Sequence, residues 1–223
     1  MSPSLRFPDP QAAADVLTFA RRAARLGDGA VRLRAGEGTL ALSSAPLAPR
    51  TLLEAVPTVL GMRFLPVDPE LVCDLTVDAG ALTAGDEAHM VRLPESAVTA
   101  PWVGISPPRR GWTGDGTLPA SLLASRAQWG IAAVAEQVPT DAGDDVVHRI
   151  SSLVWGAADD DLGGIALGAA FTAFALGFIA GEEDAAVRRS GSWTRVSLAR
   201  GHVLVRAAGP PGLTAVRRTG INP

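Results

Sequence analysis

The chain has 223 residues, of which 47% are hydrophobic and 19% charged, and a formal net charge of −3. This composition excludes an intrinsically disordered chain and argues against a strongly basic nucleic-acid-binding domain, and the length permits a sizeable core. The one cysteine, Cys73, has no partner for a disulfide within the chain, so we expect a cytoplasmic location. Every strong base is arginine and tyrosine is absent, which is typical of a GC-rich bacterial genome.

The first part of the chain predicts one helix followed by short strands. Asp9 caps the helix and Pro10 occupies its first position. A hairpin follows at 31–42, where two alternating segments flank a Gly-Glu-Gly turn. Further strands are predicted at 58–67, 71–77, 90–93 and 98–105, with a short helix at 79–84. We therefore expect a helix with a mainly antiparallel sheet over residues 1–106.

The second part predicts a loop, three helices and a strand meander. A Pro/Gly-rich loop at 107–118 separates it from the first part. The helices are expected at 119–138, 144–155 and 162–181, and the strands at 187–189, 193–198 and 202–206. We predict an α+β protein in which 1–106 and 119–208 pack as one globular unit, with a flexible tail at 209–223.

The expected helix at 162–181 consists of twenty consecutive uncharged residues between Asp159–Asp161 and Glu182–Asp184. Such a helix is about 30 Å long, enough to span a bilayer. Because the carboxylates precede it and the arginines follow it, a span would require the whole first part to cross the membrane, and the N-terminus has no apolar signal segment. Four bulky residues follow helical spacing: Leu167, Phe171, Phe174 and Phe178. This ridge predicts a buried core helix and no membrane span.

Acidic and basic residues are separated along the second part of the chain. Residues 136–184 hold ten acids and one base, Arg149, whereas residues 185–223 hold seven arginines and no acid. Neighbouring segments of opposite charge are expected to fold against each other through ion pairs. The alternative is an exposed basic face that binds nucleic acid or another polyanion. The net negative charge and a pI near 5.6 favour the first interpretation.

No residue pattern predicts a catalytic, cofactor or metal site. Asp144 and His148 are four residues apart on an expected helix and could pair. A zinc centre needs three or four ligands, however, and His89 and His202 fall in other elements. Calcium-loop, nucleophile-elbow and phosphate-loop patterns do not occur, and a chain without lysine has no Schiff-base or P-loop lysine. We therefore expect no cofactor, no metal and no catalysis.

The loop at 107–118 carries the candidate binding residues. Arg109, Arg110 and Trp112 stand on a segment stiffened by proline and glycine, and arginine and tryptophan are enriched at binding hot spots. We expect a partner or ligand to bind there. The alternative is a plain linker in which Trp112 folds back onto the core and the arginines are solvated.

Three functions remain open. We favour a non-enzymatic cytoplasmic protein that works through contacts with a protein partner, because candidates for nucleophile, base and metal are missing. The second is a small-molecule binding protein or small enzyme whose pocket uses Arg109 or Arg110 to hold an anionic ligand. The third is a polyanion or nucleic-acid binder that uses the basic residues at 188–218.

Overall fold

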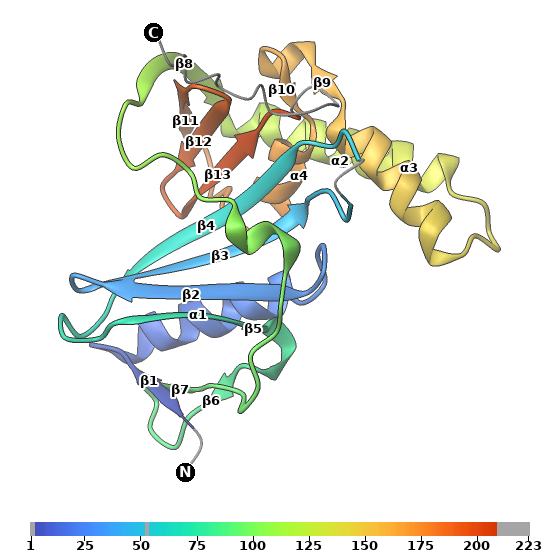
Figure 1. Cartoon of the computed structure of the whole chain (residues 1–223). Coiled ribbons are helices and arrows are strands. Elements are labelled where there is room, and N and C mark those ends of the chain that lie inside the picture. The colour runs from blue at the N-terminus through green and yellow to red at the C-terminus, as the bar shows by residue number, and fades with distance from the viewer. Residues whose placement is uncertain (1–2, 52–53, 209–223) are drawn as a thin grey trace, which may run out of the picture.

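The computed structural model describes residues 3–51 and 54–208 and has an α+β fold around one eight-stranded antiparallel sheet (Figure 1). In spatial order the strands are β5 (Cys73–Asp78), β2 (Ala30–Gly36), β3 (Thr39–Leu47), β4 (Thr58–Pro66), β13 (Gly201–Arg206), β12 (Trp193–Leu198), β11 (Asp184–Ser190) and β8 (Thr113–Pro119). The pairing of β4 with β13 joins strands from the two parts of the chain into one continuous sheet.

Smaller elements surround this sheet. The helices are α1 (Pro10–Ala23), α2 (Ala120–Gln137), α3 (Asp144–Gly156) and α4 (Gly168–Ala175), with 3-10 turns η1 (Ala79–Ala81), η2 (Pro101–Gly104) and η3 (Asp160–Leu162). A three-stranded sheet contains β1 (Ser4–Arg6), β7 (Met90–Arg92) and β6 (Thr83–Ala84), and β9 (Ala158–Asp159) pairs with β10 (Ile165–Ala166).

Local sequence signals explain several of these elements. Asp9 caps α1, since its Oδ1 accepts a hydrogen bond from the Ala12 amide at 2.8 Å, and Pro10 begins the helix as expected. The hairpin of β2 and β3 turns at Glu37-Gly38, where both residues have positive φ. The C-terminal meander of β11, β12 and β13 is confirmed in order and direction.

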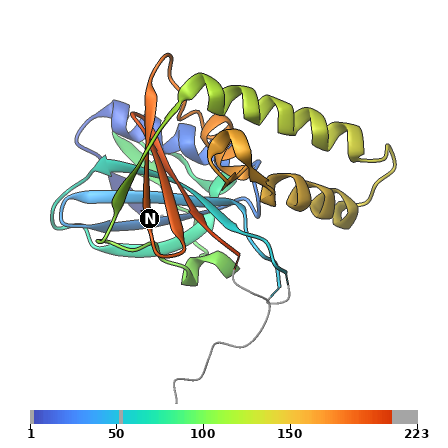
Figure 2. The same cartoon turned by 90° about the horizontal axis from the view of Figure 1, so that it is seen from above.

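The two faces of the large sheet differ in what covers them. Helices α1, α2 and α4 lie on one side, here called the helix face, and residues 101–112, here called the connecting segment, cross the other side, the open face (Figure 2). Because strand side chains alternate, Leu33, Leu42 and Val59 point to the helix face, where they are fully buried in the main core.

The predicted single helix at 162–181 is wrong. The segment forms the end of η3, then β10, then the eight-residue helix α4, which contacts α2, β4 and β13. Three glycines with positive φ interrupt it, Gly163 at 66°, Gly164 at 78° and Gly177 at 69°, and this backbone conformation ends a right-handed helix. Within residues 3–51 and 54–208, no helix is both long and apolar enough to cross a membrane.

The predicted aromatic ridge is wrong at one of its four positions. Phe178 is fully buried and stacks on Phe19 of α1, with ring centroids 6.4 Å apart. Phe171 stacks on Trp155 of α3 at 4.3 Å. Phe174 is instead 41% exposed, because the eight-residue helix α4 ends at Ala175 and does not carry one continuous ridge from Leu167 to Phe178.

Three further sequence predictions need correction. The short helix expected at 79–84 is the 3-10 turn η1 followed by the strand β6. The strand expected at 98–105 is replaced by η2, which Pro101 begins. The second half of the expected loop at 107–118 is the edge strand β8, which pairs with β11. The predicted tail at 209–223 lies outside the described residues.

Candidate functional site

A cavity of about 580 Å³ lies on the open face, between the sheet and the connecting segment. Its floor is apolar and comes from β4 and β13, through Leu60, Met62, Phe64 and Leu204. Its wall is the connecting segment, which supplies Trp102 and Trp112. We call this cavity the open-face pocket. It has the size of a small-molecule or side-chain binding site, and it stays open to solvent along one side.

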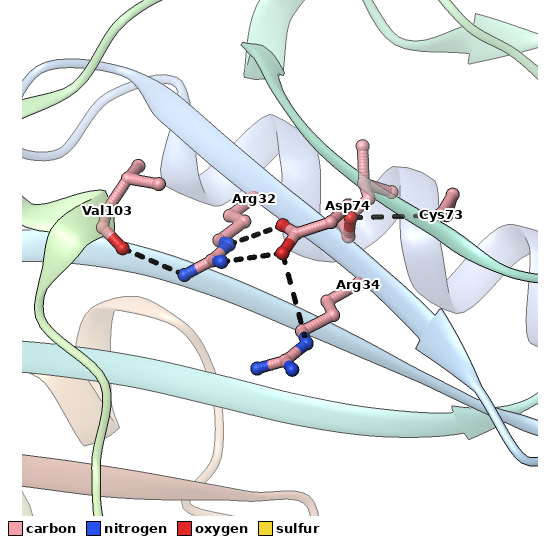
Figure 3. A network of polar contacts seen from close by, with 6 residues as sticks. Arg32, Arg34, Cys73, Asp74 and Val103 are labelled. Carbon is pink, nitrogen blue, oxygen red and sulfur yellow. Dashed lines mark hydrogen bonds and ion pairs between the residues drawn. The ribbon is translucent and has the colours of Figure 1, made fainter.

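The connecting segment is held on the open face by two buried or half-buried anchors. The indole Nε1 of Trp102 donates to Asp28 Oδ2 at 2.8 Å, and this ring is almost fully buried. The guanidinium of Arg32 donates through Nη1 to the Val103 carbonyl oxygen at 2.9 Å (Figure 3). The pocket wall is therefore fixed to the sheet before any partner binds.

Arg32 is itself fixed by a bidentate ion pair. Its Nε and Nη2 each lie 2.7 Å from one oxygen of Asp74 on the edge strand β5, and the Nε of Arg34 lies 3.9 Å from the same carboxylate (Figure 3). The hydrogen bonds from Arg32 lower the pKa of the Asp74 carboxyl, against the opposing effect of burial. Arg32 is therefore a structural cation, whereas Arg34 has only a long contact and remains half exposed.

Arg195 occupies the other end of the pocket, on β12. Its Cζ lies 4.8 Å from the centroid of the Trp112 ring, a cation–π contact. Its Nε is buried without a hydrogen-bond partner. Partial burial, and then the charge of Arg188 on the neighbouring strand, lower the pKa of Arg195. Within residues 3–51 and 54–208, this arginine is held in place by an aromatic ring, and no acid forms an ion pair with it.

His202 lies between these two ends. Its Nδ1 is 3.0 Å from Ser197 Oγ, and its ring packs against Phe64 with centroids 5.5 Å apart. Burial, and then the charge of Arg195, lower the pKa of His202, so the imidazole is neutral near pH 7. The positive charge of the pocket therefore comes from arginine.

The three residues expected to bind a partner are placed differently around this pocket. Arg109 and Trp112 line it, Arg109 as an exposed side chain and Trp112 as a half-buried one. Trp112 also donates from Nε1 to the Pro108 carbonyl oxygen at 2.9 Å, which closes the segment into a tight loop. Arg110 is exposed and is not among the residues that line the pocket.

The other sequence candidates do not assemble into a site. His148 approaches Ser152 at 3.4 Å along α3, and its described contacts do not include a hydrogen bond to Asp144. Within the described part of the chain, no three histidine, cysteine or carboxylate side chains gather as a metal site would require.

The expected pairing of the acidic and basic segments is wrong where the structure describes it. Asp159 and Asp161 pair with Arg126 of α2, and not with an arginine of the meander. Arg189 of β11 pairs with Asp115 of β8. The ion pairs described for these two segments therefore join them to other parts of the chain, and Arg217 and Arg218 lie outside the described residues.

Sequence reasoning missed four residues of the pocket, namely Arg32, Arg34, Arg195 and His202. The signal was partly visible, because the alternation of Val31-Arg32-Leu33-Arg34 already puts both arginines on one face of a strand. What the sequence did not give was the pairing of β4 with β13, which brings this face next to Arg195.

Two family models match the chain. Residues 1–104 match a domain of unknown function (DUF8010), and residues 107–210 match another domain of unknown function (DUF8185). No curated protein sequence matches the chain.

Solved structures are similar to this chain over nearly its whole length. One is the DnaN sliding clamp (DNA polymerase III subunit beta) from Bartonella birtlesii bound to griselimycin, at 12% identity and a TM-score of 0.50, covering 94% of this chain and 66% of the clamp. The fold resembles that of a sliding clamp.

Two further clamps have lower scores. The Caulobacter crescentus clamp is 12% identical with a TM-score of 0.47, covering 96% of this chain and 67% of its own. The Thermotoga maritima beta subunit is 11% identical with a TM-score of 0.47, covering 93% and 65%. This chain thus spans about two thirds of the length of these clamps. At such identity the likeness concerns the fold alone.

Proposed function

We propose that this protein is a non-enzymatic, cytoplasmic interaction protein with a clamp-like fold, and that it holds a segment of a partner protein in the open-face pocket. The observation that carries this proposal is a preformed cavity with an apolar floor, a tryptophan wall and arginines at its rim. Interfaces concentrate their binding energy in such places, where aromatic and arginine side chains surround a desolvated centre.

The covering of the sheet supports the same function. The helix face is buried under three helices, whereas the open face exposes Phe64, 48% of which is accessible, beside the half-buried Met62. A partner segment lying along the connecting segment would bury both side chains. Because Trp102 and Arg32 already fix the wall, little ordering entropy opposes binding.

The chemistry of the pocket favours binding over catalysis. Its described lining contains one histidine and one acid, His202 and Glu37, which stand on β13 and in the β2–β3 turn. His202 is hydrogen-bonded to Ser197 and oriented by Phe64, with no carboxylate recorded next to it in the described residues. General acid–base catalysis needs such a partner within hydrogen-bond reach of the reacting group.

The double change Arg109→Ala with Trp112→Ala tests the proposal. Purified wild-type protein is used to capture partners from the native cell, and mass spectrometry identifies what is retained. We expect a protein retained by the wild type to be lost by the double variant, whose melting temperature falls only modestly because Trp102 and Arg32 still anchor the connecting segment.

A matched control changes the same residue types elsewhere. Arg25→Ala with Trp129→Ala removes an arginine of the segment after α1 and an exposed tryptophan of α2, and should keep the partner. If the control loses the partner and the pocket variant keeps it, the proposal is wrong. A small anion found bound to the wild type by native mass spectrometry would favour a ligand-binding protein instead.

Polyanion binding is the second candidate. The strand register puts Arg188, Arg195 and Arg206 on the open face, since each lies opposite a residue of that face on the next strand. This arrangement favours an anionic surface over a purely apolar partner. Affinity for single-stranded DNA that falls steeply between 50 and 200 mM salt, as expected for roughly six or more phosphate contacts, would support this candidate.

A further inference from the structure

Two arginines, one on β11 and one on β12, form a pair of like charges on neighbouring strands. Arg188 lies directly opposite Arg195 in the antiparallel register, so both side chains stand on the open face. Like charges in this position repel each other, and the charge of Arg188 is felt at Arg195. An anion near both guanidinium groups would relieve this repulsion.

The described residues do not provide that negative group. The ion pairs of the described chain use other arginines, and neither Arg188 nor Arg195 takes part in one. The Arg195 Nε is buried and has no hydrogen-bond acceptor. A buried donor without an acceptor is unfavourable, so an acceptor supplied from outside would be bound favourably.

The shape of the site suits an oxyanion. Trp112 lies against the Arg195 guanidinium at 4.8 Å, and stacking of this kind leaves the edge of the fork available for two parallel hydrogen bonds. On the next strand Leu204 lies opposite Arg195, and Leu60 lies opposite Leu204. Both leucines are almost fully buried, so the apolar side chains of this face that a ligand can reach are Met62 and Phe64.

We propose that Arg195, with Arg188 beside it on the next strand, forms a carboxylate subsite at the end of the pocket, and that the partner segment presents an acidic side chain there and an apolar side chain over Met62 and Phe64. This inference rests on the proposed function, because it names the chemistry of the segment that the open-face pocket holds. The pocket lining supports it, since its described residues include four arginines, two of them Arg34 and Arg109, and one acid, Glu37.

Selection from a random decapeptide library tests the subsite without knowledge of the natural partner. Wild-type protein, Arg195→Gln, Arg188→Gln and the control Arg200→Gln are used as separate baits. Arg200 lies in the exposed β12–β13 turn, so its change removes the same charge outside the pocket. We expect wild type and control to enrich peptides with Asp or Glu next to an aliphatic or aromatic residue. Arg195→Gln should keep the apolar preference and lose the acidic one.

Affinity measurements on one selected peptide then test whether Arg195 binds the acidic side chain of that peptide. Replacing its acidic residue by the amide should weaken binding to the wild type and to Arg200→Gln by about tenfold or more, as for a charge-assisted hydrogen bond. The same replacement should change binding to Arg195→Gln less than about twofold, since the interacting group is already gone.

The outcomes separate this inference from the proposed function. Selected peptides with an apolar consensus and no acidic preference would overturn the carboxylate subsite and leave the pocket as a peptide site. An amide replacement that weakens binding to Arg195→Gln as much as to the wild type would also overturn it. Failure of the wild type to select any peptide would contradict the proposed function itself.

Discussion

The two faces of the eight-stranded sheet show how one set of strands serves two purposes. On the helix face, alternate residues such as Leu42 are fully buried beneath α1, α2 and α4. On the open face, the residues between them include arginines and a histidine, and among the described residues the connecting segment lies over them. The first face stabilises the fold, and the second carries the polar chemistry that a binding site needs.

This difference teaches where substitutions should affect stability and where they should affect binding. Burial of apolar side chains supplies most folding free energy, so the helix face should be intolerant of truncation. Half-exposed side chains around an open pocket contribute little to stability, although they contact a ligand directly.

Phe178→Ala should have the largest effect on stability. The ring is fully buried on the helix face and stacks on Phe19, so its removal leaves a cavity and should cost about 3–5 kcal/mol of unfolding free energy. Urea unfolding measures this loss. Phe174→Ala is the matched control on the neighbouring α4, and should cost under about 1 kcal/mol because that ring is 41% exposed. Equal losses would show that the two rings do not differ in burial.

Arg126→Met should have the next largest effect. Its Nε donates to Asp159 Oδ2 at 2.8 Å, and the Asp159 carboxylate is almost fully buried while also capping η3. Removing the arginine leaves that carboxylate without its counter-ion, which should cost about 2–3 kcal/mol, somewhat below a fully buried pair because Arg126 is partly exposed. Arg92→Met, which loses an exposed pair with Asp86, should change stability by less than about 0.5 kcal/mol.

Phe64→Ala should separate binding from stability on the open face. The side chain is 48% exposed and contacts His202, so its removal should cost about 1 kcal/mol or less. The same change should weaken binding of a selected peptide, because Phe64 forms part of the pocket floor. Urea unfolding and peptide titration of the same preparation measure both quantities. A loss of several kcal/mol would mean that this face is a second core.

Substitution of His202 should have the smallest effect on stability, and that effect should occur only at acidic pH. Its pKa is lowered in the folded protein from the ordinary value of 6.5, so the unfolded chain binds the proton more readily. Stability is therefore fully present above pH 6.5 and falls as the pH decreases below it. His202→Gln, which can keep a hydrogen bond to Ser197, should lose less stability between pH 7.5 and about 5.5 than the wild type. Thermal unfolding at both pH values measures the difference, and identical losses would contradict it.

The helix face could be predicted from the sequence to a large extent. The cap at Asp9, the alternation around the Gly36–Gly38 turn and the C-terminal meander each have a local cause, and each is found in the structure. The structure of residues 162–181 could not be predicted in this way, because a long helix and a buried segment broken by glycines have the same apolarity and length. Gly163 and Gly164 adopt positive φ in the exposed turn between the paired strands β9 and β10, and hydropathy carries no signal of that pairing.

The open-face pocket could be predicted only in part. The sequence singled out Arg109 and Trp112 by residue type and loop position, and both line the cavity, whereas Arg110 does not. Arg195 and His202 come from strands about 90 residues further on, and their approach depends on the pairing of β4 with β13. Such long-range pairing leaves no local signal, so a single sequence does not reveal which arginines share a pocket.

Hydrogen exchange with and without a selected peptide tests the central claim most directly, because it reports where the partner segment lies. We predict that amides of the connecting segment, especially at 105–112, exchange more slowly when the peptide is bound, while amides of α1 and α2 on the helix face are unchanged. Slower exchange confined to the helix face, with the connecting segment unaffected, would contradict the assignment of the open face as the binding surface.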